Sequence, residues 1–382
     1  MLSKFKVGII GCGLMASNHV YGYLNSEKFE IVALADPYVE AMKDFDDMFG
    51  HVNAYSPKHY TDPVAMLDNE TLDVVSIGVW HKEHVKWTIE AAKRKPRVIL
   101  CEKPMTESLE SAQKMIETCN QYKVDLIIGH QRRFLPAYIV VRDLLKNGAI
   151  GKIELIKAVS GAGLLNWATH HFDMIRFILG DIDCEWVMGA VERNTDRFER
   201  EVKIEDRAIG TFGFANGIIA MLFSDVTKDF YQGGMIYGSE GMIDLRTEYF
   251  RILNEDTSGK WEKRIPKGLY HSPSEPSFET REANSYQAKE IADLLEGKIK
   301  VHRGEAIHGY RALEMVSAIY ESTRIHQLIN LPLNTLEYPL DLLVDSGHLS
   351  VKIPGKYDIR EFLVRDKKGK RDANITRFNF FP

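Results

Sequence analysis

A glycine-rich turn near the start of the chain has the residue types and spacing that bind a dinucleotide. Gly11-Cys12-Gly13-Leu14-Met15-Ala16 fits the G-x-G-x-x-G/A pattern, directly after an apolar run and at the start of a helical pattern. Gly11 permits the tight turn, Gly13 lets the backbone approach a pyrophosphate, and Ala16 allows close packing of helix on sheet. The free N–H groups at the helix start, including those of Leu14 and Met15, stabilise phosphates together with the helix dipole.

A carboxylate follows at the position where it would select the cofactor. Asp36 ends the second apolar run, 20 residues after Ala16. A carboxylate there accepts hydrogen bonds from the adenosine ribose hydroxyls and repels a 2′-phosphate, which favours NAD over NADP. The alternative is that Asp36 only initiates a turn before Pro37.

A lysine and a histidine could carry the chemistry of a reacting hydroxyl. Lys103 follows a short apolar run, so it is expected at the carboxyl edge of a sheet, where ligands bind and an ammonium can stabilise developing negative charge. His170 could take a hydroxyl proton, because imidazole titrates near neutrality. Asn166, His170 and Asp173 are spaced to share one helix face. The alternatives are a surface lysine beside Glu102 and a core histidine.

The first third of the chain alternates short apolar runs with helical patterns, which is typical of parallel βα units in a doubly wound sheet. Strands are expected at Phe5–Ile10, Glu30–Ala35, Leu72–Val79, Arg97–Cys101 and Val124–Gly129, and helices at Ala16–Leu24, Val39–Phe49, Glu83–Lys93 and Leu109–Tyr122. We therefore predict an N-terminal NAD-binding Rossmann domain, α/β in class, over residues 1–130.

The pattern changes after Phe134-Leu135-Pro136. Helices are expected at Ala137–Asn147, Trp167–Leu179, Ala283–Leu295 and Glu305–His326, a strand at Lys152–Ser160, and mostly strands over Glu185–Ile265. Strands without intervening helices usually pair antiparallel. Residues 131–382 are therefore expected to form an α+β substrate-binding and oligomerisation domain on a large, mainly antiparallel sheet. Pro266–Pro276 is interpreted as a polar loop and Lys367–Arg371 as a solvated charge run.

Composition narrows the class of partner. The 382 residues are 45% hydrophobic and 27% charged, with a net charge of −5, so the sequence has no basic field for nucleic acid or an anionic membrane. No apolar run approaches the roughly 20 residues of a membrane helix. The four cysteines, Cys12, Cys101, Cys119 and Cys184, form no CxxC pair and are interpreted as reduced thiols of a cytoplasmic protein, with no metal site.

Several motifs, in this order, resemble the Gfo/Idh/MocA oxidoreductase family over about the first 330 residues. Their order is Gly11–Ala16 with His19, Asp73-Val74-Val75 through His84, Glu102-Lys103-Pro104, Gly129 to Pro136 with its Arg133-Phe134-Leu135-Pro136, and Asn166 to Asp173 in place of D-x-G-x-H-x-x-D. Gly238-Ser239-Glu240-Gly241 and Leu331-Pro332-Leu333 also fit. The glycine-rich turn alone would be weak, but the ordered set is specific.

The resemblance implies an NAD(H)-dependent enzyme acting on a hydroxyl of a sugar, sugar derivative or cyclitol. Lys103 and His170 would be catalytic. The substrate would contact Asn166, Asp173, Arg133 and Trp167. The cofactor would contact Gly11, Gly13, Leu14, Met15, Asp36, Trp80, His81, His84, Glu102 and Lys103. The resemblance also implies a homodimer or homotetramer formed through the C-terminal sheet.

Three departures from the family pattern keep alternatives open. Asn166 stands where the family usually has Asp, so it supplies hydrogen bonds but no negative charge. Ala168 replaces the usual Gly, and Trp80-His81 stands where the family often has Pro-Asn. One alternative is a glycoside hydrolase or epimerase that recycles NAD, in which no NADH accumulates. The other is a non-catalytic NAD-binding regulator, although such a protein would not need both Lys103 and His170.

Overall fold

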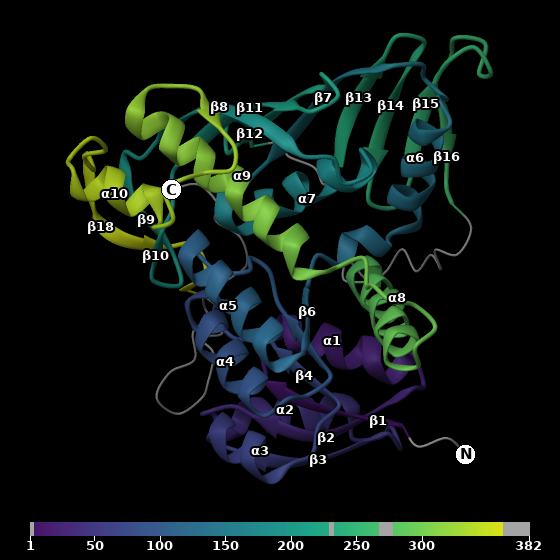
Figure 1. Cartoon of the computed structure of the whole chain (residues 1–382), viewed down its shortest axis with the longest axis vertical. Helices are drawn as coiled ribbons and strands as arrows, with labels where there is room; N and C mark the ends of the chain where they lie inside the picture. Colours follow the sequence, from purple (N-terminus) through teal and green to yellow (C-terminus); the bar gives the residue numbers. More distant parts are fainter. Residues whose placement is uncertain (1–3, 229–232, 267–277, 362–382) are drawn as a thin grey trace.

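The computed structural model describes residues 4–228, 233–266 and 278–361. Within these ranges the chain forms two large sheets with helices packed between them. A third, small sheet lies at one end of the larger sheet (Figure 1). The predicted polar loop Pro266–Pro276 and the charge run Lys367–Arg371 lie, apart from Pro266, outside the described residues.

The N-terminal sheet has six parallel strands in the order β3-β2-β1-β4-β5-β6, which confirms the predicted doubly wound fold. The strands are β1 (Phe5–Ile10), β2 (Phe29–Ala35), β3 (Tyr55–Tyr60), β4 (Val74–Ile77), β5 (Val98–Cys101) and β6 (Asp125–Ile128). The helices are α1 (Leu14–Asn25), α2 (Val39–Phe49), α3 (Pro63–Asn69), α4 (His81–Lys93) and α5 (Leu109–Tyr122). All four residues of β4 and of β5 are buried, as expected for strands covered on both faces.

The second sheet is larger and mixed, with nine strands in the order β16-β15-β14-β13-β7-β12-β11-β8-β17. Only β7 and β12 pair in parallel, and the other neighbours are antiparallel. The strands are β7 (Ile153–Ser160), β8 (Cys184–Glu192), β11 (Arg207–Phe214), β12 (Ile219–Ser224), β13 (Gly233–Gly238), β14 (Gly241–Arg246), β15 (Phe250–Leu253), β16 (Glu262–Arg264) and β17 (Ile329–Asn330). The expected mainly antiparallel sheet is confirmed.

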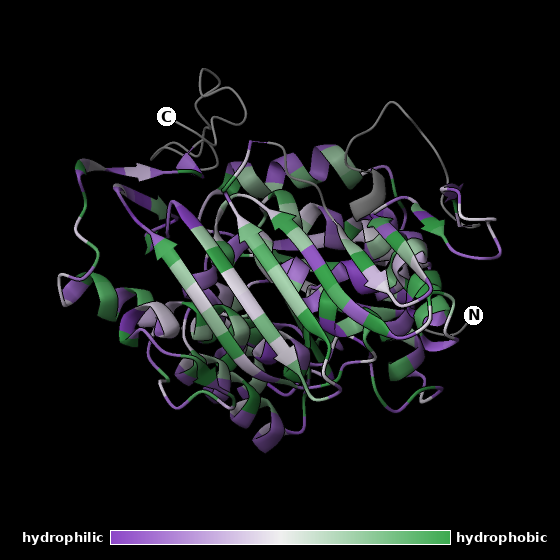
Figure 2. Cartoon of the chain, turned by 90° about the horizontal axis from the view of Figure 1, so that it is seen from above, coloured by the Kyte–Doolittle hydropathy of each residue, from purple (hydrophilic) through white to green (hydrophobic). Residues whose placement is uncertain are grey.

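One face of the large sheet carries helices and the other does not, within the described chain. The helices are α6 (Pro136–Lys146), α7 (Thr169–Ile178) and α9 (Ala306–Ile325), with a 3₁₀ turn at Gln131–Phe134. In Figure 2 the strands lie in front of these helices and show alternating hydrophobic and hydrophilic residues on the open face. Met188 and Ile209 are about half exposed there.

Helix α8 (Phe278–Leu295) returns from the second sheet to the first unit of the fold. It packs along α1 (Figure 1), and Ile291 and Ala292 are buried in the same apolar cluster as Ala16 and Val20. The two helices approach closely at Gly22, where a Cβ atom would lie 2.6 Å from the carbonyl oxygen of Asn284. The parallel sheet is therefore covered by a helix from the far end of the chain.

The C-terminal part of the described chain adds a small sheet that the sequence did not predict. It comprises β9 (Thr195–Glu199), β10 (Val202–Lys203) and β18 (Ile353–Asp358), in the order β10-β9-β18. Only β18 follows helix α10 (Pro339–Asp345) in the chain. Strand β18 runs parallel to β9, so residues about 160 positions apart in sequence lie side by side.

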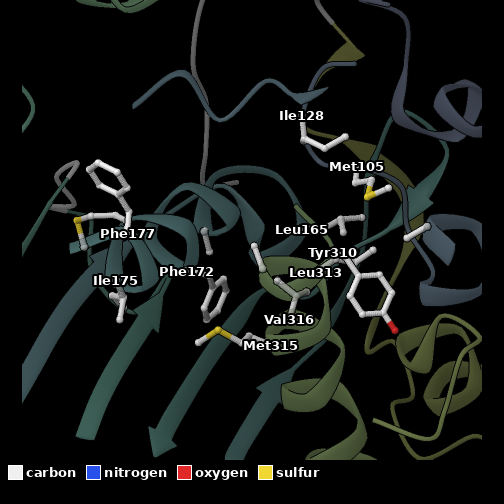
Figure 3. Close-up of a cluster of buried hydrophobic side chains, with 14 of the residues drawn as sticks. Met105, Ile128, Leu165, Phe172, Ile175, Phe177, Tyr310, Leu313, Met315 and Val316 are labelled. Carbon is white, nitrogen blue, oxygen red and sulfur yellow. The ribbon is translucent and has the colours of Figure 1, made fainter. Parts of the chain in front are cut away.

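The main apolar core joins the two large sheets. Figure 3 shows Met105, Ile128 and Leu165 gathered with side chains of α9 such as Leu313, and all four belong to one buried cluster. Met105 follows the turn after β5, and Leu165 lies on the short helix before α7, so both turns rest on the same core. Across the described residues, no helix is both long and apolar enough to cross a membrane.

Candidate active site

The site lies where the parallel strands of the first sheet end. Gly11 follows β1, Asp36 follows β2, Gly78 follows β4 and Lys103 follows β5. Because all these strands are parallel, their carboxyl ends meet at one edge. The strand order reverses between β1 and β4, which is the place where ligands bind in open α/β sheets.

A groove of about 510 Å³ runs along this edge and is lined by Gly11–Gly13, Asp36, Tyr38 and Trp80, among others. Gly11 has φ +86°, and a Cβ atom there would lie 2.8 Å from Val79 Cγ1. By contrast, a Cβ atom on Gly13 would meet nothing closer than the Gly78 carbonyl oxygen at 3.8 Å. The turn therefore requires a glycine at position 11. Gly13 instead leaves open space in which a ligand can approach the protein backbone.

Asp36 is fixed by the backbone around it. Its Oδ2 accepts the N–H of Cys12 at 2.8 Å, and its Oδ1 accepts the N–H of Tyr38 at 2.9 Å. The Asp36 carboxylate also lines the groove. The predicted turn role and the predicted ligand-facing role of Asp36 are thus compatible.

A second cavity of about 260 Å³ adjoins the groove and shares Gly13, Gly78, Val79 and Trp80 with it. From the first unit it is lined by Leu14, Met15, Glu102, Lys103 and Pro104, and from the second by Asn166, Trp167, Glu199, Arg200 and Arg360. The turn at the start of α1 and the lysine after β5 therefore face one space together with side chains of the second unit.

Lys103 and Asn166 meet in this cavity. The Nζ of Lys103 donates to Asn166 Oδ1 at 3.0 Å and to the Asn166 carbonyl oxygen at 3.3 Å. Burial lowers the pKa of Lys103 to about 8, although the nearby carboxylates of Glu102 and Glu199 act in the opposite direction. An amine with this pKa exchanges a proton readily near neutral pH, as a general acid–base group must.

A buried pair holds the turn that carries Lys103. Glu102 Oε1 accepts a hydrogen bond from His19 Nε2 at 2.8 Å, and His19 Nδ1 lies 2.8 Å from Ser76 Oγ. Glu102 Oε2 accepts the backbone N–H of Lys103 at 3.1 Å. Although burial raises the pKa of Glu102, the hydrogen bond from His19 and the charge of Lys103 lower it below its usual range. Glu102 is therefore ionised and anchors the backbone of Lys103.

Asn166 lies on a single turn of π-helix, Gly163–Ala168, that leads into α7. Two buried carboxylates hold its first backbone N–H groups. Asp225 accepts from Ala162 and Gly163 at 2.9 Å each, and Glu205 accepts from Leu164 at 2.6 Å. π-helical turns are rare and frequently found at functional sites. These contacts fix the position of the turn and hence the position of Asn166 relative to Lys103.

His170 lies one turn farther along, is nearly fully buried, and is not among the residues that line the cavity. Its ring packs edge-on against that of His130, with 5.8 Å between the ring centres. Burial, with the positive charges of Arg132 and Lys103, holds the pKa of His170 well below its usual range. The imidazole is therefore neutral near neutral pH, and its Nδ1 has no hydrogen-bond partner among the described residues.

The structure does not bring Arg133 and Asp173 into the cavity. Arg133 Nε donates to both carboxylate oxygens of Asp173 at 2.8 and 2.9 Å, and its Nη2 contacts Asp181 at 2.9 Å. Arg133 and Asp173 are 1% and 2% exposed, and neither lines the cavity. In this structure their shared ion pair links the 3₁₀ turn before α6 to α7.

The two predicted histidines of α4 differ in their surroundings. His84 Nδ1 lies 2.9 Å from the carbonyl oxygen of Pro104 and Nε2 lies 3.2 Å from that of Val79, so the ring sits between the segments that follow β4 and β5. His81 is 1% exposed, and burial, with the charge of Arg200, holds its pKa well below the usual range. Trp80, by contrast, lines both cavities.

Comparison with known families identifies this arrangement. Residues 5–130 match the GFO_IDH_MocA model, described as "Oxidoreductase family, NAD-binding Rossmann fold", and residues 156–331 match the companion "Oxidoreductase family, C-terminal alpha/beta domain". The chain belongs to the Gfo/Idh/MocA oxidoreductase family. The two matches cover most of the chain and confirm the resemblance carried by the motifs.

Individual relatives have low sequence identity to this chain, but some align over most of its length. The chain is 25% identical over 370 residues to D-apiose dehydrogenase of Paraburkholderia graminis, covering 91% of this chain and 95% of that protein. It is 24% identical over 254 residues to myo-inositol 2-dehydrogenase of Thermotoga maritima, covering 62% and 74%. The match to the rhizopine catabolism protein MocA of Rhizobium meliloti, at 28% identity, covers 47% of this chain and 58% of that protein.

A solved structure shares the fold. Levoglucosan dehydrogenase, in complex with NADH and levoglucosan, superposes with a TM-score of 0.72 at 19% identity, covering 87% of this chain and 100% of that one. For this Gfo/Idh/MocA chain the cofactor is NAD, as the family model describes. The groove fits it, because Gly13 leaves space at the start of α1, whose first N–H groups have no side-chain cap.

Several residues at the site were not anticipated in these roles. The motif comparison included His19, but only the structure shows that it anchors Glu102. Glu199, Arg200 and Arg360 line the cavity although no motif contains them. They come from the small sheet and the residues after it, and no periodic pattern in the sequence links those two segments. The four cysteines are buried, and none forms a disulfide within the described residues.

Proposed function

We propose that this oxidoreductase removes hydride from a secondary hydroxyl carbon of a sugar or cyclitol, with Lys103 as the principal proton acceptor. The observation that carries the proposal is the buried Lys103 ammonium, which lies in a cavity lined by both units and next to the groove of the nucleotide-binding turn. The sugar and cyclitol class is supported by relatives named D-apiose dehydrogenase and myo-inositol 2-dehydrogenase.

The protein's own groups account for the movement of the proton. NAD⁺, when bound, supplies the hydride acceptor. Oxidation of the carbinol also releases the hydroxyl proton, and the neutral form of Lys103 takes it while the C–O bond gains double-bond character. Lowering the pKa of Lys103 to about 8 keeps part of the amine neutral under ordinary conditions. In the reverse direction the ammonium donates the same proton.

His170 would assist rather than replace Lys103. Its pKa is held well below the usual range, so the ring stays neutral and can accept a hydrogen bond from a substrate hydroxyl. Asn166 and Trp167 line the cavity and would hold other hydroxyls. Substrate contacts by Arg133 and Asp173 remain predictions of the family pattern, as do cofactor contacts by His81 and His84.

A panel of sugars and cyclitols incubated with NAD⁺ tests the proposal, with NADH absorbance and product mass followed together. The wild-type protein should form NADH and a product two hydrogens lighter. Lys103→Met and His170→Ala should each lower turnover by roughly 10²-fold, the usual size of a general acid–base contribution. Lys82→Met, on the exposed side of α4, is the matched control and should retain activity.

Two results would point to the alternative functions. A changed product without NADH accumulation would indicate that the oxidation is followed by re-reduction, as in a cofactor-recycling hydrolase or epimerase. Tight NADH binding with no chemical change in any sugar or cyclitol would favour a regulator. Retained turnover in the Lys103→Met, His170→Ala double variant would reject the assigned roles.

We also propose that the chain forms a homodimer or homotetramer through the open face of its large sheet. Apolar residues such as Met188 and Ile209 are exposed on that face, and open sheet faces of this size are suited to self-association. Light scattering of the wild-type protein and of the Met188→Lys variant tests this interface.

We further propose a division into an NAD-binding domain over residues 1–130 and a substrate and oligomerisation domain over residues 131–382. We also propose that the protein is cytoplasmic.

A further inference from the structure

Two arginines from the small sheet and the residues after it face the cavity of Lys103. Arg200 lies in the turn between β9 and β10, and Arg360 follows β18. Both line the cavity together with Glu199. The charges of Arg360 and Glu199 act on Lys103, and that of Arg200 acts on His81, so this part of the cavity wall is electrostatically close to the proposed reaction centre.

One carboxylate fixes both arginines by their backbones. Asp358 Oδ2 accepts the N–H of Arg200 at 2.9 Å, and Asp358 Oδ1 accepts the N–H of Arg360 at 2.8 Å. The backbones of Arg200 and Arg360 are therefore held next to each other by a single residue of β18. In these contacts Asp358 binds main-chain atoms only, so it does not engage either guanidinium group.

The turn that presents Arg200 is strained. Arg200 and Glu201 have φ of +47° and +71°, the left-handed region that hairpins of two residues usually fill with Asn and Gly. Each such non-glycine residue costs about 1 kcal/mol or more, and such strain concentrates at binding sites. A simple connection between β9 and β10 would not need a long cationic side chain at this position.

The guanidinium groups are incompletely satisfied. Arg360 is 9% exposed, and its Nε, like that of Arg200, is buried without a hydrogen-bond acceptor among the described residues. The closest carboxylate oxygen, Glu199 Oε1, lies 3.5 Å from Arg360 Nε. Buried donors in native proteins normally have acceptors, so unmet Nε–H groups on two arginines that line the same cavity point to an acceptor that the protein itself does not supply.

The charges lining the cavity leave a positive excess. Lys103, Arg200 and Arg360 are cationic, whereas Glu102 and Glu199 are anionic, and Glu102 is already bound to His19. With Lys103 protonated, three cations against two carboxylates leave one positive charge, and with Lys103 neutral the charges balance, so the cavity suits a monoanion better than a phosphate dianion. Guanidinium groups match the planar geometry of a carboxylate with paired N–H donors.

We infer that the substrate is a sugar acid, whose carboxylate is bound by Arg200 and Arg360 while its hydroxyl-bearing carbon faces Lys103. This assignment rests on the proposed function and narrows its substrate class. Arg200 and Arg360 are substrate-binding residues in it, and Asp358 is a positioning residue. The pyrophosphate of the cofactor is the other possible anion, and the experiment separates the two.

Matched pairs of neutral and acidic compounds test the inference, namely glucose with glucuronate and gluconate, and galactose with galacturonate. NADH formation should favour the acids, with kcat/KM at least about tenfold higher than for the neutral partner. Arg200→Gln and Arg360→Gln should each raise KM for the acid about tenfold or more and so lower the acid-to-neutral ratio, while the Kd for NADH stays within about twofold. Arg207→Gln, an exposed arginine on β11, is the control and should leave the ratio unchanged.

Other outcomes would overturn the inference without touching the proposed function. Neutral sugars turned over as well as their acids, or arginine variants that leave the ratio intact, would remove the carboxylate site. A weakened Kd for NADH with an unchanged KM would assign the arginines to the cofactor. If no compound is oxidised, the proposed function fails. A thermal-shift assay of the NADH complex then tests the anion site by itself. Stabilisation by glucuronate but not by glucose would support the site, and equal shifts would reject it. Melting of each variant checks that it is folded.

Discussion

The ammonium of Lys103 donates to the side-chain oxygen of Asn166 at 3.0 Å, across the junction of the two units of the fold. Asn166 stands where the family usually has an aspartate, so this contact is a neutral hydrogen bond in place of an ion pair. An uncharged partner does not counteract the effect of burial, and the pKa of Lys103 is lowered to about 8.

The pH dependence of the reaction should report this pKa. If Lys103 accepts the hydroxyl proton, oxidation requires the neutral amine, whose fraction rises with pH through the pKa and then levels off. We expect kcat/KM for oxidation to increase about tenfold per pH unit below 8 and to plateau above it. In the direction of reduction the profile should be the mirror image. A flat profile between pH 6 and 9, in steady-state assays corrected for cofactor stability, would contradict the role.

Replacing Asn166 by Asp should shift that profile in a defined direction. A carboxylate 3 Å from Nζ favours the charged amine, so the pKa of Lys103 should rise by about one unit or more. The limb of the oxidation profile should move to higher pH, and activity near neutrality should fall in the oxidative direction. Asn166→Ser, which restores no charge, is the control. An Asp variant with an unshifted limb would show that Lys103 is not the titrating group.

The two glycines of the nucleotide turn should respond differently to an added methyl group. Gly13→Ala meets no protein atom closer than 3.8 Å, so the melting temperature of the free protein should change little while NADH binding weakens about tenfold or more. Gly11→Ala places Cβ 2.8 Å from Val79 at φ +86° and should lower both. Fluorescence titration with NADH and thermal melting separate the effects. Equal loss of stability in both variants would contradict this division.

Asp36 should enforce the choice of cofactor. Its carboxylate lines the groove and would repel a 2′-phosphate, so the Kd for NADPH should exceed that for NADH by about tenfold or more. Asp36→Ser with Tyr38→Arg should reverse part of the preference. Because Asp36 also accepts two backbone N–H groups, this variant should melt at a lower temperature. Tighter binding of NADPH by the wild-type protein would refute the assignment.

The buried ion pair of Arg133 should matter for stability. Arg133→Met leaves the carboxylate of Asp173 buried without its partner, which costs about 3–5 kcal/mol for pairs of this kind. Urea unfolding should show the loss as a lower midpoint. Arg142→Met is the matched control, because Arg142 is about one-third exposed and contacts Asp181 at 3.5 Å, so its contribution should be about 1 kcal/mol or less. Similar midpoints for the two variants would argue against a structural role.

The sequence predicted the parts of the fold that depend on local pattern. Helices α2 and α5 begin and end where the apolar periodicity placed them, and the glycine turn, Asp36 and Lys103 all lie at the expected sheet edge. Strand β3 and helix α3 were not predicted, because β3 is an edge strand with only Tyr55 buried and α3 spans two short turns. An edge strand has little apolar pattern to detect.

The candidate site was predictable only where the motifs are contiguous. Lys103 and Asn166 were both identified, but their contact joins segments 63 positions apart and depends on the packing of two units. Helix spacing predicted Asp173 on the face of His170, yet it could not show that Arg133 binds that carboxylate. Arg200 and Arg360 were missed because their convergence requires the parallel pairing of β18 with β9, a long-range event without a local signal.

The packing of α8 against α1 has a consequence for how the protein can be divided into fragments. A fragment cut after the last parallel strand would carry every nucleotide-binding motif but would leave the apolar side of α1 facing water, because Ile291 and Ala292 would be missing. Such a fragment should aggregate or need detergent. Supplying α8 as a separate peptide, or splicing it behind α5 through a linker, should restore solubility, so the proposed domain of residues 1–130 depends on α8 to cover its apolar surface.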